Sequence, residues 1–249
     1  MRPYHDTEKQ RRPLSRRSTA GLLLGLASVL GAPAAWAQFS GSVAVLSDYR
    51  FRGLSLSDNS ATPQLTMNYD SDAGWYAGAM ASHATLEESG TAQLIAYGGY
   101  AQRLPGGLGW EAGATQTVFT RVSADNYLEA YVGVSGEQVS ARLYYSPRYF
   151  GRPAQTLYAE ANGFLRLGET LRLVAHIGLL RALGGEDNIG PLSGHRYDYR
   201  LGLATRLGDI DLQLARATRA AYRYPSYPGY PPYQGRQPHA FVLSASYSF

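Results

Sequence analysis

Apolar and polar residues alternate with a period of two along most of the chain, and the last segment shows this most clearly. From His239 to Phe249 the sequence reads HAFVLSASYSF, in which every second residue from Phe241 onward is apolar or aromatic. Ser244, Ser246 and similar small residues occupy the positions between them. Successive side chains of a β-strand point to opposite faces, so this period predicts a strand with one apolar and one polar face.

Twelve segments of this kind follow one another. They begin near Phe39, Thr62, Trp75, Ala92, Trp110, Tyr127, Val139, Leu157, Leu171, Arg196, Ile210 and His239. Tight turns rich in Gly and Asp alternate with longer links, which we expect at 53–61, 85–91, 120–126, 150–156, 184–195 and 219–238. This alternation is typical of an up-and-down meander whose two ends face different compartments. Ten or 14 strands also fit the pattern, and the facing of 75–103, where Gly and Ala are frequent, stays open.

The first 37 residues have the features of a secretory signal. A basic stretch reaches Arg17, an apolar stretch runs from Ala20 to Gly31, and small residues flank Trp36 at Ala35 and Ala37. This order predicts a Sec signal peptide cleaved after residue 37, because the apolar stretch is too short to span a bilayer as a helix. We therefore expect one folded domain over residues 38–249.

Alternation alone fits either a soluble β-sandwich or a membrane barrel. Charges lie on the polar face of nearly every segment, and the chain ends in an aromatic residue. Together with the export signal, they predict an all-β fold: an antiparallel up-and-down transmembrane barrel of about 12 strands, with both termini periplasmic. The C-terminal strand resembles the signal that the barrel-assembly machinery of the outer membrane recognises, through Phe241, Leu243, Tyr247 and Phe249.

Composition excludes several classes of function. The chain has no cysteine, which rules out disulfide scaffolds, thiol nucleophiles and iron–sulfur ligation. Residues 38–249 carry 17 Arg and 17 acidic residues, so no excess of basic charge indicates nucleic-acid binding. The acidic stretch at 184–188 lacks the spaced Asp pattern of an EF-hand, and we expect no metal or cofactor. No nucleophile or nucleotide motif is present, and adjacent Ser82 and His83 would face opposite ways, so we expect no enzyme.

The charged positions on the polar faces form the predicted lining of a lumen. They are Asp48, Arg50, Arg52, Glu111, Glu129, Arg142, Arg148, Glu160, Arg166, Arg172, His176, Asp198 and Arg200, with Arg206 and Asp211 on the same faces. Such charges must be paired or hydrated, because an unpaired charge in a dry interior costs several kcal/mol. Two alternatives remain: a narrow pore for small hydrophilic or charged solutes, which we favour, or a salt-bridged plug that closes the barrel.

The link at 219–238 interleaves aromatic residues with proline. Its candidate contact residues are Tyr222, Arg223, Tyr224, Tyr227, Tyr230 and Tyr233. Proline favours an extended backbone that cannot join a strand ladder. The segment is therefore a ligand-contacting loop, a constriction or a plain exterior loop. It motivates an alternative function, a closed structural, ligand-binding or adhesive barrel that acts through this loop; a lipid hydrolase is the third and least favoured hypothesis.

Three motifs carry a family resemblance. They are SDYRFRGLS at 47–55, GWYAG at 74–78 and YYSPRYFG at 144–151. They resemble the TorF family of proteobacterial porin-like proteins, which implies an outer-membrane barrel. We expect lipid and lipopolysaccharide around this barrel and small hydrophilic solutes as its other partners. The resemblance implies a glutamine and an acidic residue where this chain has Leu56 and Arg148. It names no solute and no oligomeric state.

Overall fold

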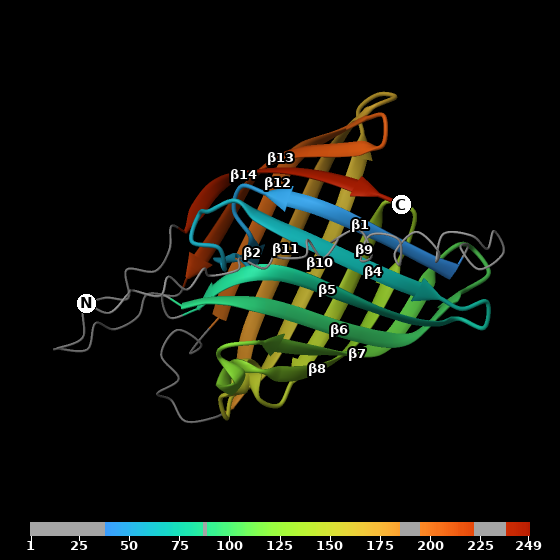
Figure 1. The fold of residues 1–249 in the computed structure, drawn as a ribbon. Coiled ribbons are helices and arrows are strands. Elements are labelled where there is room, and N and C mark those ends of the chain that lie inside the picture. The colour runs from blue at the N-terminus through green and yellow to red at the C-terminus, as the bar shows by residue number, and fades with distance from the viewer. Residues whose placement is uncertain (1–37, 87–88, 185–194, 222–237) are drawn as a thin grey trace, which may run out of the picture. The chain divides into compact units, whose positions relative to one another are not determined.

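The structure, a computed structural model, describes residues 38–86, 89–184, 195–221 and 238–249. These residues belong to one compact unit, Ala37–Phe249. Twelve antiparallel strands close into a barrel in the order β1-β14-β13-β12-β11-β10-β9-β8-β7-β6-β5-β4, which confirms the predicted fold (Figure 1). None of the helices among the described residues is long and apolar enough to cross a membrane.

The barrel strands begin close to the predicted positions. They are β1 (Phe39–Leu46), β4 (Thr62–Asp70), β5 (Trp75–Leu86), β6 (Ser89–Arg103), β7 (Gly109–Phe119), β8 (Tyr127–Ser135), β9 (Val139–Ser146), β10 (Gln155–Arg166), β11 (Leu171–Gly184), β12 (His195–Leu207), β13 (Ile210–Ala221) and β14 (His239–Ser248). Strand β1 pairs with β14, and Phe249 exchanges two backbone hydrogen bonds with Gly41, so the closure extends to the last residue.

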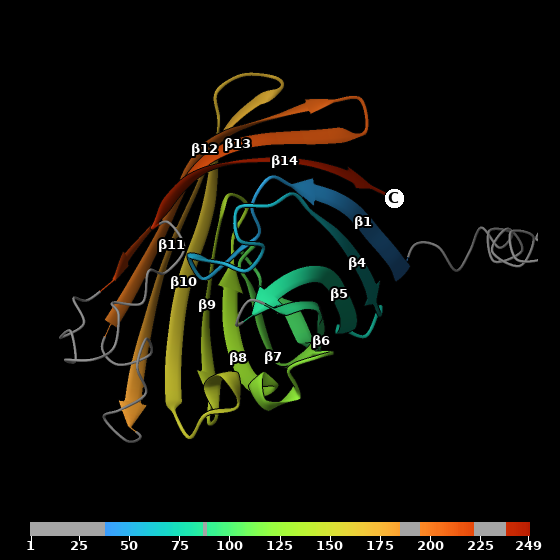
Figure 2. The same ribbon diagram turned by 60° about the vertical axis from the view of Figure 1, so that its left-hand side comes forward.

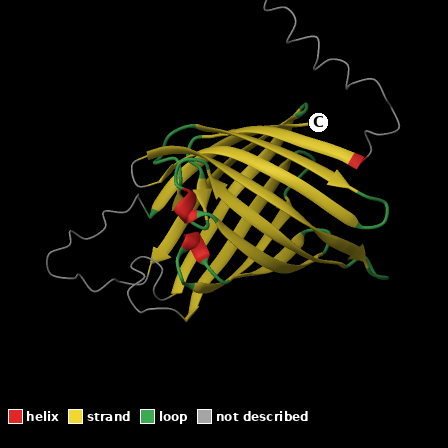
Figure 3. Ribbon diagram, turned by 60° about the horizontal axis from the view of Figure 1, so that its bottom comes forward, coloured by secondary structure: helices red, strands yellow, loops and turns green. Residues whose placement is uncertain are grey.

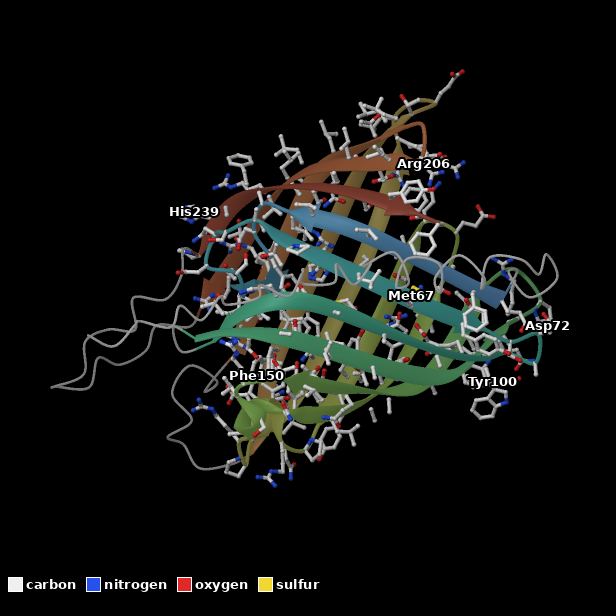
Figure 4. All side chains as sticks on the ribbon, in the orientation of Figure 1. Met67, Asp72, Tyr100, Phe150, Arg206 and His239 are labelled. Atoms are coloured by element: carbon white, nitrogen blue, oxygen red, sulfur yellow. The ribbon has the colours of Figure 1, made fainter. Side chains whose placement is uncertain are left out.

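The two ends of the barrel differ in their connections. The turns at 71–74, 104–108, 136–138, 167–170 and 208–209 lie at one end, which we call the turn end. The other connections, which are longer except for the two residues between β5 and β6, join the strands at the opposite end, which we call the loop end. Figure 4 labels Asp72 and Arg206 at the turn end and Phe150 and His239 at the loop end.

The wall is apolar outside and polar inside. In β8, Tyr127, Glu129 and Tyr131 are buried, whereas Leu128 and Val132 are exposed. Near the turn end, the ring of Tyr100 packs against Trp75 in a T-shaped contact and against Trp110 in a tilted one, on the outside of the barrel, as in the aromatic girdles of membrane barrels. A row of exposed large apolar side chains is what a lipid environment permits and water does not.

The facing of 75–103 follows from pairs of tyrosine and glycine. Tyr76 lies directly opposite Gly99, and Tyr97 opposite Gly78, with both pairs facing the lumen. A Cβ on Gly99 would lie 2.7 Å from the hydroxyl oxygen of Tyr76, so the tyrosine ring lies across the bare backbone of the neighbouring strand. The many glycines of these strands therefore make room for large inward side chains.

Three sequence predictions about connections were wrong. The first wall strand ends at Leu46 and does not continue to Arg52, because the chain turns into the lumen there. The expected link at 85–91 is mostly strand, with Thr85 paired to Gly90. Arg148 does not lie on a strand but in the connection that holds the short helix η5 (Tyr149–Gly151). Residues 222–237, which include all the candidate contact residues of the Tyr/Pro link, lie outside the described residues.

Candidate functional site

Residues 47–61 fold into the barrel, and we call them the lumen hairpin. Two short strands, β2 (Arg50–Phe51) and β3 (Leu54–Ser55), pair with each other inside the ring of wall strands (Figure 2). At the tip, Arg52 has φ 49° and Gly53 has φ 74°, so both central residues are left-handed, as a type I′ turn requires. An arginine seldom adopts this conformation, which marks the tip as constrained by its surroundings.

The tip of the lumen hairpin crosses to the far wall. Both terminal nitrogens of Arg52 donate to the carboxylate of Glu129 on β8, at 2.8 and 2.7 Å. The guanidinium carbon also lies 4.1 Å from the ring centroid of Tyr158 on β10. The side chains of Arg52 and Glu129 are only 6% and 3% exposed, so this is a buried, bidentate ion pair. Burial opposes the charge of Arg52, but nearby Tyr149 and Glu129 raise its pKa above the ordinary value.

Gly53 brings the tip equally close to the other side of the lumen. A Cβ at this position would lie 2.6 Å from the Cβ of Asp198 on β12 and 3.2 Å from that of Arg219 on β13. Only a glycine fits here without a shift of the wall or the hairpin. The tip is therefore held between β8 and β10 on one side and β12 and β13 on the other.

The base of the lumen hairpin is tied by Asp48. Its carboxylate accepts hydrogen bonds from Arg50 Nε at 2.6 Å, Ser55 at 2.5 Å and Ser57 at 3.2 Å. The adjacent Tyr49 hydroxyl donates to Gln93 on β6 at 2.7 Å, and burial raises the pKa of this phenol. Asp48 thus stabilises the hairpin. The prediction that Asp48 lines the open lumen was wrong.

An apolar cluster surrounds this base and occupies the loop end of the lumen. Its members are Tyr49, Leu56, Ala84, Phe119, Tyr127, Tyr149, Tyr158 and Leu180. Helix η5 and η4 (Ser123–Asp125) lie side by side at this end (Figure 3), and Phe150 of η5 stacks on Tyr127 and Phe119. The lumen therefore has an apolar, filled loop end.

A polar cavity of about 630 Å³ lies against the tip of the lumen hairpin. On its β7–β9 wall, Arg142 Nε donates to Glu111 at 2.6 Å, and the Tyr76 hydroxyl from β5 donates to the same carboxylate at 2.8 Å. On the β10–β12 wall, His176 Nε2 lies 2.7 Å from Asp198 Oδ1, and its Nδ1 lies 2.8 Å from Asn162 Oδ1. Arg142 and Glu111 pair opposite charges across strands, and Asp198 has His176 as a hydrogen-bond partner, so the carboxylates of both walls are satisfied.

Arg200 differs from these paired arginines. It lines the same cavity and is exposed, and no described acidic side chain lies within ion-pair distance of it. Its cross-strand neighbours are His176 and the small Ala217. The guanidinium is therefore accessible to a solute in the cavity.

The structure places most predicted lumen residues at the cavity. Those that line it are Arg50, Arg52, Glu111, Glu129, Arg142, Glu160, His176, Asp198 and Arg200. Arg166 and Arg172 are cross-strand neighbours at the turn end, where Arg172 pairs with Asp211.

The predicted position of Arg148 was wrong. Arg148 is exposed at the loop end, donates a hydrogen bond to the carbonyl of Gly151 at 3.2 Å and does not line the cavity. The sequence reasoning missed the lining tyrosines Tyr76, Tyr97, Tyr131, Tyr144 and Tyr158.

Two further predictions concern the outer wall and the histidines. The aromatic and apolar residues of the C-terminal strand, Phe241, Leu243, Tyr247 and Phe249, are all exposed on the outside. Their role in assembly stays a prediction. Ser82 is buried on the inward face of β5 and His83 is exposed on the outward face, so the expected opposite facing is confirmed.

Comparison with known proteins adds a family and a fold. A family model described as "Bacterial protein of unknown function (Gcw_chp)" matches residues 31–222, which is more than half of the chain. This chain belongs to the Gcw_chp family. No curated protein matches the Gcw_chp chain in sequence.

Among solved structures, the Gcw_chp barrel is similar to two small porins. A KdgM porin has a TM-score of 0.52 at 11% identity, covering 84% of this chain and 99% of its own. A NanC porin has a TM-score of 0.53 at 12% identity, covering 83% of this chain and 98% of its own. A KdgM porin in complex with disordered oligogalacturonate gives 0.50 at 10% identity, covering 85% and 99%. At these identities the likeness shows the fold alone.

Proposed function

We propose that this protein is an outer-membrane channel for the passive diffusion of small hydrophilic or charged solutes. The observation that carries the proposal is the polar, charged cavity inside a closed barrel whose outer wall is apolar. A spanning sheet must close because lipid cannot satisfy open strand edges, and a polar lumen then offers hydrated passage. The likeness in fold to the KdgM and NanC porins and the resemblance to the TorF family both support this proposal.

The lining suggests how solutes would be held in transit. Arg200 offers an accessible donor fork, while the tyrosine hydroxyls and ring faces beside it offer neutral hydrogen bonds and flat apolar contact. One similar porin was solved with an acidic saccharide, an oligogalacturonate. We propose hydrophilic solutes of modest size as the class and leave their charge to measurement. No cofactor and no catalytic step enter the proposal.

In this proposal the lumen hairpin is the constriction of the channel. It spans the lumen at the loop end, so a solute must pass the Arg52–Glu129 pair or displace it. Hydrogen bonds, the Arg52–Glu129 ion pair and apolar packing at its base hold the hairpin in the lumen, with no covalent crosslink to the wall. Its seating is therefore an equilibrium that substitutions can shift.

Single-channel recording tests the proposal. The protein, extracted from the outer membrane and reconstituted in a planar bilayer under a salt gradient, should show discrete current steps. The reversal potential then gives the sign of the preferred ion. Absence of steps from wild-type protein shown to be folded would overturn the channel. A second protein, in which a Gly/Ser link replaces residues 50–55, then shows whether the hairpin closes the lumen.

A second candidate is a closed barrel that acts through its exterior segments. The filled loop end and the buried ion pair of the lumen hairpin favour it. The same two proteins separate the candidates: a closed barrel predicts no current from the wild type and current only from the variant with the replaced hairpin. Under a channel, the wild type conducts and the variant conducts more.

A further inference from the structure

Arg216 lies on the outer wall of the barrel, among apolar side chains. Arg216 on β13 is exposed and has Leu201 of β12 and Phe241 of β14 as its direct cross-strand partners. Directly paired residues share one face of a sheet, and both partners are strongly exposed on the outside. The guanidinium therefore projects from the wall into the surrounding lipid and not into the lumen.

The surroundings of Arg216 change from apolar to polar toward the loop end. On the turn side its outward neighbours are Leu203, Leu214 and Leu243, all exposed. On the loop side Thr218 follows on the same strand, flanked directly by Tyr199 and His239. The rings of Tyr197 and Tyr199 stack with centroids 6.5 Å apart. Exposed tyrosines mark the headgroup level of membrane barrels, so Arg216 stands one residue pair below that level.

This position is costly unless the charge finds a partner. An arginine facing the hydrocarbon is destabilising in proportion to its depth, and a long side chain relieves this by reaching toward the interface. No described acidic side chain lies within ion-pair distance of Arg216. The remaining source of negative charge at that level is the headgroup layer of the membrane itself.

We propose that Arg216, together with Tyr199, Thr218 and His239, binds the phosphate of a lipid in the leaflet at the loop end. The guanidinium fork matches two phosphate oxygens, and the flanking hydroxyl groups donate further hydrogen bonds. The leucines on the turn side of the site accept the acyl chains of the same molecule. A bound lipid, and not free phosphate, fits this arrangement because the polar and apolar parts of the site are continuous on one wall. The inference rests on the barrel lying in a bilayer and not on channel activity.

Native mass spectrometry of the full protein from outer membranes tests the site. The detergent-solubilised protein is titrated with bisphosphorylated lipid A and, separately, with lipid A freed of both phosphates. The Arg216→Gln variant should bind the phosphorylated lipid with about fivefold lower affinity. This is the change expected from the loss of one cation near an anionic lipid surface. Arg206→Gln removes the same charge near the turn end, where Figure 4 labels Arg206, and should bind as the wild type does.

Three results would overturn the inference. The first is equal loss of lipid in the Arg216→Gln and Arg206→Gln variants, which would make the effect one of net charge. The second is equal binding of phosphate-free lipid by the wild type, which would assign retention to the aromatic and apolar wall. The third is a change from oligomer to monomer in Arg216→Gln with lipid retention unchanged, which would place Arg216 in an interface between copies of the chain.

Discussion

Arg52 combines two unfavourable features at one residue. Its left-handed backbone costs of the order of 1–3 kcal/mol for a residue with a side chain, and its charge is almost fully buried. The bidentate contact with Glu129 and the ring face of Tyr158 offset these costs only while the lumen hairpin is seated. Arg52 therefore couples the conformation of the tip to its place in the lumen.

Removal of the partner carboxylate tests this coupling. Glu129→Gln keeps the shape of the side chain but leaves Arg52 as a buried cation without a counter-charge. We expect a loss of about 3–5 kcal/mol in the free energy of unfolding, the usual result of breaking a buried pair from one side. Denaturant unfolding in micelles measures it, with Glu169→Gln in the exposed 167–170 turn as control. Equal stability of the two variants would show that the Arg52–Glu129 pair does not hold the hairpin.

At the scale of the element, the lumen hairpin divides the interior into two environments. Its base packs in the apolar cluster at the loop end, and its tip bounds the polar cavity. A displacement of the hairpin would therefore expose apolar surface at its base and open the lumen beyond the cavity at the same time. The exposed apolar surface makes this displacement unfavourable, so the seated position is the resting state.

A reversible crosslink tests whether this element moves. The chain has no cysteine, so Gly53→Cys with Arg219→Cys introduces one pair only. A Cβ on residue 53 would lie 3.2 Å from the Cβ of residue 219. This is slightly below the range of about 3.5–4.5 Å in disulfides, so the small shift of the tip that the Gly53→Cys substitution requires brings the pair into bonding range. We expect a smaller bilayer conductance when the pair is oxidised than after reduction, because the closed disulfide holds the tip to β13. Gly53→Cys alone is the control, because it carries the same shift of the tip away from Asp198, whose Cβ would lie 2.6 Å away. If reduction leaves the conductance of the double variant unchanged, the hairpin stays fixed during transport.

The strands of the wall could be predicted from the sequence, whereas the position of the lumen hairpin could not. Lipid outside and polar lumen inside impose the same period of two on every wall strand, so Trp75, Tyr127 and Val139 begin strands in both prediction and structure. The period continues through Tyr49–Arg52 because a hairpin inside the lumen also alternates its faces, and alternation cannot distinguish the two places. Arg52–Gly53 as a two-residue turn was the available signal, but arginine is an unusual residue for that position. The inward tyrosines Tyr76, Tyr97 and Tyr131 were missed because only the strand register reveals the glycine opposite each of these rings.

At the scale of the whole molecule, charge is arranged so that few lumen groups act at long range. The pairs Arg52–Glu129, Arg142–Glu111 and Arg172–Asp211 each cancel within a few ångströms. A paired charge contributes little to the potential along a pore, whereas an unpaired one near the axis acts on every passing ion. The selectivity of the barrel should therefore depend on Arg200 more than on the number of arginines in the lumen.

Charge reversal at Arg200 gives this argument a direct test. Arg200→Glu places a carboxylate at the cavity, so the reversal potential under a salt gradient should move toward cation preference. Arg148→Glu makes the same change of charge on an exposed residue outside the cavity lining and should leave the reversal potential unchanged. Both variants keep the wall strands intact, since neither residue takes part in a described ion pair. If the two variants shift the potential equally, selectivity arises at the loop end of the barrel, and the cavity around Arg200 does not determine it.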